Sequence, residues 1–156
     1  MLLASGQCRT LECEAAGSPV GLGVDGSASN DGSNMAQELR QAFLLQRLRY
    51  GAEHITHDTV INWATRGSAA CLGRSDIGTL AVGSCADLAF FSLNDIRYSG
   101  ADDPLAALVL CGTDSAEHVM VNGQWKVRNG EPVDIDLEAL KAQHRGLARR
   151  LLERVA

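Results

Sequence analysis

The segment at residues 19–34, PVGLGVDGSASNDGSN, constrains the fold of this chain more than any other. Residues 20–24 are apolar or glycine and do not alternate with polar residues, as a half-solvated strand would. Such a run is typical of a strand buried on both faces, as in parallel α/β sheets and barrels. Asp25 follows directly and opens a loop of Gly, Ser and Asn. Because active-site residues of α/β barrels lie at the carboxyl ends of strands, the segment predicts an α/β fold with a site at Asp25.

Two helices are expected after this strand, at residues 35–50 and 57–72, so the first part of the chain contains a strand–loop–helix unit. Both helices have polar N-caps and glycine stops. These end residues are Ser33 or Asn34 and Gly51 for the first helix, and Thr56 and Gly73 for the second. The apolar stripe that we expect the second helix to bury consists of Val60, Ile61, Ala64, Ala69 and Leu72.

The rest of the chain predicts a small antiparallel sheet and two further helices. A β-rich run covers residues 88–93, and Asn122 and Gly123 form the strongest short-range hairpin signal between two short strands. Residues 104–110 can form a short helix with proline at its first position. Residues 134–156 contain a charged amphipathic helix with leucines on one side.

Charge and hydropathy limit the classes of partner. The chain has 156 residues, of which 46% are hydrophobic, and a net charge of −5. Lysine and arginine cluster only in the C-terminal helix, so we expect no basic face for nucleic acid. No apolar run approaches the roughly 20 residues that span a bilayer, so we expect no membrane partner.

The five cysteines indicate a reducing compartment. They are odd in number, irregularly spaced and without a CxxC pair, which favours free thiols over a disulfide framework or a zinc ribbon. We interpret them as small core residues. Because the N-terminus also does not have the pattern of a signal peptide, we expect a cytoplasmic location. The cysteines are Cys8, Cys13, Cys71, Cys85 and Cys111.

Asp25 is the residue of this chain with the clearest candidate chemical role. A carboxylate at the end of a barrel strand can bind a divalent metal and take a proton from metal-bound water, whose pKa the ion lowers to about 7. An aspartate that opens a Gly/Ser loop can equally well cap a turn, and the residues alone leave both interpretations open. Ser27 and Asn30 in the following loop can orient Asp25, contact a polar substrate, or only shape the turn.

The histidines do not form a clear ligand set. His54 and His57 are three residues apart, but they flank a predicted helix cap, so we do not assign them to a metal site. His118 and His144 are expected at the surface. The chain has no P-loop, GxGxxG, GxSxG or HExxH pattern, and we expect no dinucleotide site.

Three stretches in order resemble the C-terminal portion of the amidohydrolase superfamily, in the branch of cytosine, guanine and triazine deaminases. GVDGSASNDGSNM is similar to the eighth barrel strand and its loop, with Asp25 at the position of the metal-binding aspartate. Residues 64–93 resemble the helix and the return into the small β-sandwich domain, and residues 118–131 resemble the closing hairpin of that domain. The first stretch is most similar to the 8-oxoguanine deaminases, whose relatives include enzymes named hydroxydechloroatrazine ethylaminohydrolase.

The resemblance implies the C-terminal part of a zinc-binding (β/α)8 TIM barrel with a small β-sandwich domain. Residues 1–76 would be the last βα units of the barrel, residues 77–133 part of the sandwich, and residues 134–156 a C-terminal amphipathic helix. The implied reaction is the hydrolytic release of ammonia from 8-oxoguanine or a related purine or heterocycle. Asp25 would serve as metal ligand and catalytic proton acceptor. The HxH pair, the further histidines and the glutamate of such enzymes have no counterpart in this sequence.

We therefore expect these residues to be part of a larger protein and to be inactive alone. We expect the complete protein to be a homo-oligomer that acts on a small heterocyclic molecule. A triazine amino- or chlorohydrolase of the same superfamily is an alternative. An alternative of another class is a non-catalytic α+β module that binds a partner through its C-terminal helix, with Asp25 as a capping residue.

Overall fold

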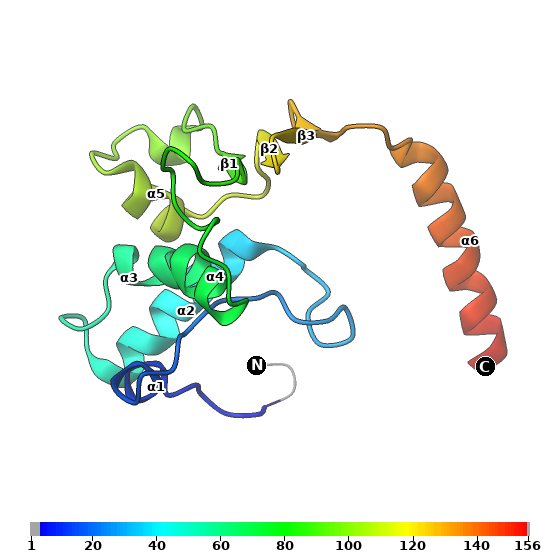
Figure 1. Ribbon diagram of the computed structural model, residues 1–156. Coiled ribbons are helices and arrows are strands. Elements are labelled where there is room, and N and C mark those ends of the chain that lie inside the picture. The colour runs from blue at the N-terminus through cyan, green and yellow to red at the C-terminus, as the bar shows by residue number, and fades with distance from the viewer. Residues whose placement is uncertain (1–3, 156) are drawn as a thin grey trace.

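The computed structural model describes residues 4–155, which form a helical group, a small sheet and a C-terminal helix that projects from them (Figure 1). The helical group contains α1 (Thr10–Ala15), α2 (Met35–Tyr50), α3 (His57–Asn62), the π-helical turn η1 (Trp63–Gly67) and α4 (Ser68–Cys71). Because α3, η1 and α4 follow one another without a break, they make up one helical stretch. Both helices predicted for this part of the chain are confirmed.

α2 begins and ends where the sequence predicts. The Asn34 side-chain oxygen accepts the backbone N–H groups of Ala36 (2.9 Å) and Gln37 (3.3 Å), which have no partner inside the helix. The Asn34 amide also donates to the carbonyl oxygen of Asp114 at 3.2 Å, which ties the helix start to a distant segment. Gly51 ends the helix with φ 97°, a conformation that favours glycine.

Replacing Asn34 by Ala is expected to lower the free energy of unfolding by about 1–2 kcal/mol, because the Ala36 N–H loses its acceptor and the Gln37 N–H keeps only the backbone carbonyl of residue 34. Chemical denaturation measures this change. Asn94→Ala is the control, since Asn94 is exposed and its side chain makes no hydrogen bond within the described residues. Its effect should stay within about 0.5 kcal/mol. Equal losses in the two variants would contradict a capping role for Asn34.

The core lies between α2, α3 and α5 (Pro104–Cys111). Side chains from all three helices and their ends are almost completely buried there: Phe43, Ile55, Val60, Trp63 and Val109. Full burial of such a side chain contributes roughly 1.5–3 kcal/mol. The indole N–H of Trp63 donates to Glu14 Oε1 at 2.7 Å, so the one polar atom of this side chain has a partner.

The stripe predicted for the second helix is buried at Val60 and Ala69, but the prediction is wrong at Leu72, which is 71% exposed. Leu72 follows the last turn of α4 and borders a shallow groove together with residues 21–23. No described residue covers this groove. Helical spacing places a side chain on a face, but burial also requires a neighbour across that face.

Residues 20–24 are extended but form no strand, so the predicted buried strand is wrong for this chain. A strand exists through ladder hydrogen bonds to a neighbour, and every strand within residues 4–155 belongs to the small sheet further along the chain. The neighbouring strands that the apolar run predicts are not among the described residues.

Four short strands form one antiparallel sheet in the order β1–β2–β3–β4. They are β1 (Leu88–Phe90), β2 (His118–Val121), β3 (Gln124–Arg128) and β4 (Glu131–Pro132). The predicted hairpin is confirmed, because Asn122 (φ 48°) and Gly123 (φ 76°) join β2 to β3 with the two positive φ angles of a type I′ turn. The run predicted over residues 88–93 ends earlier, at Phe90.

The connection from β1 to β2 joins the sheet to the helical group. It contains the short 3-10 helix η2 (Ile96–Tyr98) and α5, which is the predicted helix at residues 104–110. α5 packs against both α2 and α3 (Figure 1). The sheet is therefore attached to the helices through an element that buries Ala107 and Val109.

α6 (Leu137–Val155) confirms the predicted terminal helix and extends away from the rest of the chain (Figure 1). None of its residues is buried. Among the helices of residues 4–155, none combines the length and the apolar character that a membrane crossing requires.

All five cysteines are free thiols, but the prediction that they are core residues is wrong for three of them. Cys8, Cys71 and Cys111 are exposed, whereas Cys13 and Cys85 are partly buried. The Cys71 thiol lies beside the same groove as Leu72, 3.7 Å from the carbonyl oxygen of Pro19. Cysteine is usually buried, but residue type predicts burial only on average. Cys71 is exposed because no described residue covers the surface around it.

Candidate functional site

The extended segment at residues 20–24 is held against the second helical stretch by Ser68. The Ser68 hydroxyl accepts the N–H of Leu22 at 3.2 Å. Its own proton can go to the carbonyl oxygen of Leu22 (3.1 Å) or of Trp63 (2.9 Å). One side chain thus fixes the backbone three residues before Asp25.

Two glycines allow the backbone of this segment to lie directly on the helix. A Cβ atom added at Gly67 would lie 2.0 Å from the carbonyl oxygen of Val20, and one added at Gly21 would lie 2.9 Å from Cα of Ser68. Both distances are shorter than any ordinary contact of a Cβ atom. The close approach therefore requires glycine, and it sets the point at which the segment leads into Asp25.

Asp25 ends the extended segment with a left-handed backbone, φ 63°, which aspartate tolerates better than most residues. Its Oδ1 accepts the N–H of the next residue, Gly26, at 2.7 Å. The side chain is exposed, and within residues 4–155 its second oxygen has no hydrogen-bond partner. Asp25 therefore makes one local bond and keeps one carboxylate oxygen available to a further ligand.

Asn30 holds the loop after Asp25 to the start of α2. Its amide donates to Glu38 Oε1 at 2.6 Å, and its oxygen accepts the N–H of Gly32 at 3.1 Å. Ser27 is exposed, and its side chain makes no hydrogen bond in the part of the chain that the structure describes. The structure thus brings Asn30, but not Ser27, to the cleft that Asp25 borders.

This cleft has a volume of about 560 Å³ and lies between residues 20–25, α2 and the chain that leads into α1. Polar residues of α2, among them Glu38 and Gln41, also line it. The sequence gives little reason to select them. An acid in the first turn of a helix is favoured by the helix dipole alone, and a glutamine on a polar helix face has no distinguishing spacing.

The described residues do not make a complete metal site. Residues 4–155 contain no group of three or more His, Cys, Asp or Glu side chains placed to hold an ion. Zinc in proteins normally has at least three protein ligands. Asp25 with its available oxygen therefore fits one position of such a site, and the remaining donors would have to come from elsewhere.

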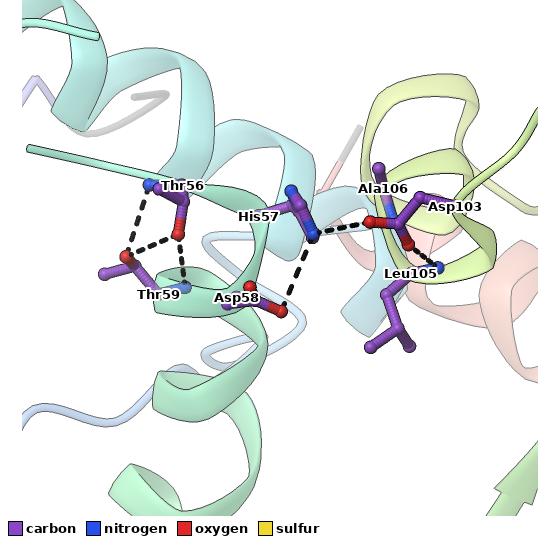
Figure 2. Close-up of polar contacts among 7 residues, drawn as sticks. All are labelled: Thr56, His57, Asp58, Thr59, Asp103, Leu105 and Ala106. Carbon is purple, nitrogen blue, oxygen red and sulfur yellow. Dashed lines mark hydrogen bonds and ion pairs between the residues drawn. The ribbon is translucent and has the colours of Figure 1, made fainter. Parts of the chain in front are cut away.

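The two histidines that are close in sequence contact different carboxylates. His57 Nε2 lies 3.0 Å from Asp103 Oδ2 and 3.6 Å from Asp58 Oδ1, at the meeting point of α3 and α5 (Figure 2). His54 Nε2 lies 3.6 Å from Glu53 Oε1. The His57 contact therefore links two elements of the core.

Asp103 is the N-cap of α5. Its Oδ1 accepts the N–H groups of Leu105 (2.8 Å) and Ala106 (3.0 Å) (Figure 2). These bonds to the ionised carboxylate, together with the nearby His57 ring, hold the pKa of Asp103 below its ordinary value of 3.8.

Asp103→Asn is expected to make the protein less sensitive to acid. Because the folded-state pKa of Asp103 is lowered, its stabilisation is present above the unfolded pKa of about 4 and is lost as pH falls through the folded value. The stability difference between wild type and Asp103→Asn should therefore be largest near neutral pH and shrink below about pH 4. Urea midpoints across this range measure it. Asp102→Asn, at the exposed neighbouring carboxyl, controls for the loss of one charge, and a parallel acid response in the two variants would contradict the prediction.

Residues 1–126 match the amidohydrolase family, and the chain belongs to this family. It is 61% identical, over 97% of its length, to the 8-oxoguanine deaminase of Pseudomonas aeruginosa. It is 41% identical, over 88% of its length, to the hydroxydechloroatrazine ethylaminohydrolase of Pseudomonas sp. (strain ADP). The chain spans about a third of these relatives, 34% and 30% of their respective lengths.

Solved structures of enzymes from this family share the fold of the chain. An adenosine deaminase from Xanthomonas campestris with bound zinc matches 97% of the chain with a TM-score of 0.90 and 30% identity, and the match covers 35% of that protein. An atrazine chlorohydrolase from Arthrobacter aurescens TC1, in complex with zinc, matches 91% of the chain with a TM-score of 0.84 and 40% identity, and the match covers 32% of that protein. The mixed helix and sheet arrangement is therefore part of an amidohydrolase fold.

Proposed function

We propose that the chain is part of a zinc-dependent hydrolytic deaminase that releases ammonia from 8-oxoguanine or a related purine or heterocycle. The observation that carries this proposal is the 61% identity to the 8-oxoguanine deaminase of Pseudomonas aeruginosa across 97% of the chain. The exposed Asp25 carboxylate at the edge of a cleft supports it, because it offers one hard oxygen donor to an ion.

In this proposal, residues 1–76 are the last βα units of a (β/α)8 TIM barrel, and residues 20–24, which form no strand among the described residues, would pair with strands from the rest of the complete protein. Residues 77–133 are part of a small β-sandwich domain, and residues 134–156 form the C-terminal helix. The uncovered groove beside residues 21–23 supports the barrel assignment, since strands on either side of this segment would cover it. These strands would be formed by residues of the complete protein that are not among these 156.

The proposed roles of the site residues follow from their contacts. Asp25 would give its available oxygen to zinc and hold a proton during the reaction, while its other oxygen keeps the bond to Gly26. Zinc, when bound by its full set of ligands, supplies an activated water at neutral pH. Asn30 would keep the loop in place through Glu38, and Ser27 would shape the loop or contact the substrate. With a single ligand, the 156 residues alone would be inactive.

The remaining expectations concern the complete protein. We propose a small heterocyclic molecule as its substrate, a homo-oligomeric assembly and a cytoplasmic location. The five free thiols support a reducing compartment.

The test is an assay of ammonia release by the full-length protein, expressed from the complete reading frame that contains these residues. We expect the highest kcat/KM on 8-oxoguanine within a panel that also contains guanine, cytosine and hydroxylated triazines. A zinc-loaded protein that releases no ammonia from any of these compounds would overturn the proposal.

A triazine amino- or chlorohydrolase is the second candidate function. It is favoured by the 41% identity to hydroxydechloroatrazine ethylaminohydrolase and by a TM-score of 0.85 at 40% identity to a triazine hydrolase variant. The same assay separates the two candidates. A higher kcat/KM for release of ethylamine or chloride from a triazine than for ammonia from 8-oxoguanine would select this second function.

A further inference from the structure

A buried polar pair joins the start of α1 to α2. Thr10 is 4% exposed and Gln46 is 5% exposed. The Thr10 hydroxyl donates to Gln46 Oε1 at 3.0 Å, and the Gln46 amide donates to the carbonyl oxygen of Cys8 at 3.3 Å. A glutamine is costly to bury unless its amide is hydrogen-bonded, whereas an apolar side chain of the same size has no such requirement. The two bonds are therefore the property that distinguishes Gln46 from an apolar residue at this position.

These bonds hold residues 6–10, the N-terminal segment, against α2. The Gln7 side chain adds a third bond, because its amide donates to the carbonyl oxygen of Leu45. Among the described residues, no buried side-chain nitrogen or oxygen lacks a partner, so the network is complete. A complete network of buried polar groups is rigid and specifies one arrangement. The N-terminal segment therefore has a defined position on α2.

The N-terminal segment forms part of the cleft that Asp25 borders. Its residues in the lining of this cleft are Gly6, Gln7, Cys8 and Thr10. Gln46 also lines the cleft, as does Glu38, which accepts the Asn30 amide and so holds the loop after the metal-ligand candidate. Glu38 and Gln46 are eight residues apart on one face of α2, a separation of about 12 Å along the helix axis. One helix therefore holds both this loop and the N-terminal segment, and it sets the spacing between them.

We propose that Gln46 is a positioning residue of the deaminase, which fixes the N-terminal segment and thereby sets the fit of the heterocyclic substrate in this cleft. The role rests on the proposed function, because it takes the cleft beside Asp25 as part of the substrate site. Other contacts hold Asp25 itself. Ser68 holds the backbone before Asp25, and Glu38 holds the loop after it. Loss of the Gln46 bonds should therefore weaken substrate binding and leave the metal ligand in place.

Gln46→Met in the full-length protein tests this role, because methionine is close to glutamine in size and can make neither bond. We expect the KM for 8-oxoguanine to rise at least about tenfold and kcat to stay within about threefold. The reason is that a misplaced binding contact weakens the ground state and the transition state equally, which changes KM alone. Zinc content should be unchanged. Gln143→Met is the matched control, since it makes the same substitution at an exposed residue of α6, and it should change none of these quantities.

Two variants of Thr10 separate positioning from packing. Thr10→Val keeps the shape of the side chain and removes the bond to Gln46 Oε1, so its KM should rise, but less than that of Gln46→Met. Thr10→Ser keeps the hydroxyl and loses a methyl group, so it should have the KM of the wild type. A residue pair that only fills space predicts the opposite order, with Thr10→Ser more harmful than Thr10→Val, and this result would overturn the proposal.

Hydrogen exchange of the zinc-loaded protein without substrate gives a readout that does not depend on turnover. Amides of the N-terminal segment should exchange faster in Gln46→Met than in the wild type, and amides of residues 26–32 should exchange at the same rate in both. The proposal is overturned if exchange in the segment does not change, if KM stays at the wild-type value, or if KM, kcat and zinc content all change together. In each of these cases the activity of the wild type still supports the proposed function. A wild type that releases no ammonia from any compound of the panel overturns the proposed function, and the role of Gln46 with it.

Discussion

Asp25→Asn in the full-length protein is expected to lower ammonia release by at least about 100-fold, because second-shell changes alone cost metal enzymes up to that factor. Zinc content should fall with activity. Asn has nearly the shape of Asp, can accept the Gly26 N–H at Oδ1, and also tolerates the left-handed backbone. The turn should therefore survive, while the negative charge that attracts an ion is lost. Metal analysis by mass spectrometry and the ammonia assay measure the two effects.

Asp31→Asn is the matched control for this variant, because Asp31 is an exposed carboxylate in the same loop. It should keep zinc and activity. If Asp25→Asn also keeps both, the carboxylate makes only its local bond to Gly26, and the proposed role of Asp25 is wrong. If both variants lose zinc equally, the effect comes from the net charge of the loop and not from a ligand at position 25.

The helices of this protein could be predicted closely from local sequence, because their ends depend on short-range chemistry. Asn34 and Thr56 accept N–H groups of the turn that follows them, and Gly51 takes a positive φ. The hairpin at Asn122 and Gly123 is predictable for the same reason. Each of these signals involves atoms within a few residues of one another.

Predictions that depend on distant neighbours were less successful. The run at residues 20–24 indicates an extended backbone, but whether it is a strand depends on other segments that must lie beside it. Leu72 follows the apolar spacing of its helix and is nevertheless exposed, because the surface beside it is open. Local pattern therefore predicts conformation better than it predicts burial.

The candidate site also combines a residue that local sequence predicts with contacts that only the structure shows. Asp25 can be found from sequence because it directly follows an apolar run. The Ser68 bonds to Leu22 join residues 46 positions apart, and only the structure shows that they fix the segment before Asp25. The bond between Asn30 and Glu38 spans eight residues across a turn and a helix cap, and no periodic pattern marks it.

Gly67→Ala is expected to lower the free energy of unfolding by roughly 3 kcal/mol, at the upper end of the usual cost of overpacking. The new methyl group would lie 2.0 Å from the carbonyl oxygen of Val20. The obstacle is backbone on both sides, so no side chain can rotate away to relieve it. The extended segment must move off the helix, which also weakens the bonds between Ser68 and Leu22. Because Asp25 ends this segment, zinc content of the full-length protein should fall as well.

Gly146→Ala is the matched control, since it makes the same substitution inside α6, where an added Cβ meets no atom within 4 Å. It should stabilise the helix by about 0.5–1 kcal/mol, because alanine is the better helix former. Denaturant midpoints measure both changes in the free energy of unfolding, which are expected to have opposite signs. If Gly67→Ala were as harmless as Gly146→Ala, the segment before Asp25 would be free to shift on the helix. The position of the carboxylate would then have to be set by the loop that Asn30 holds to Glu38.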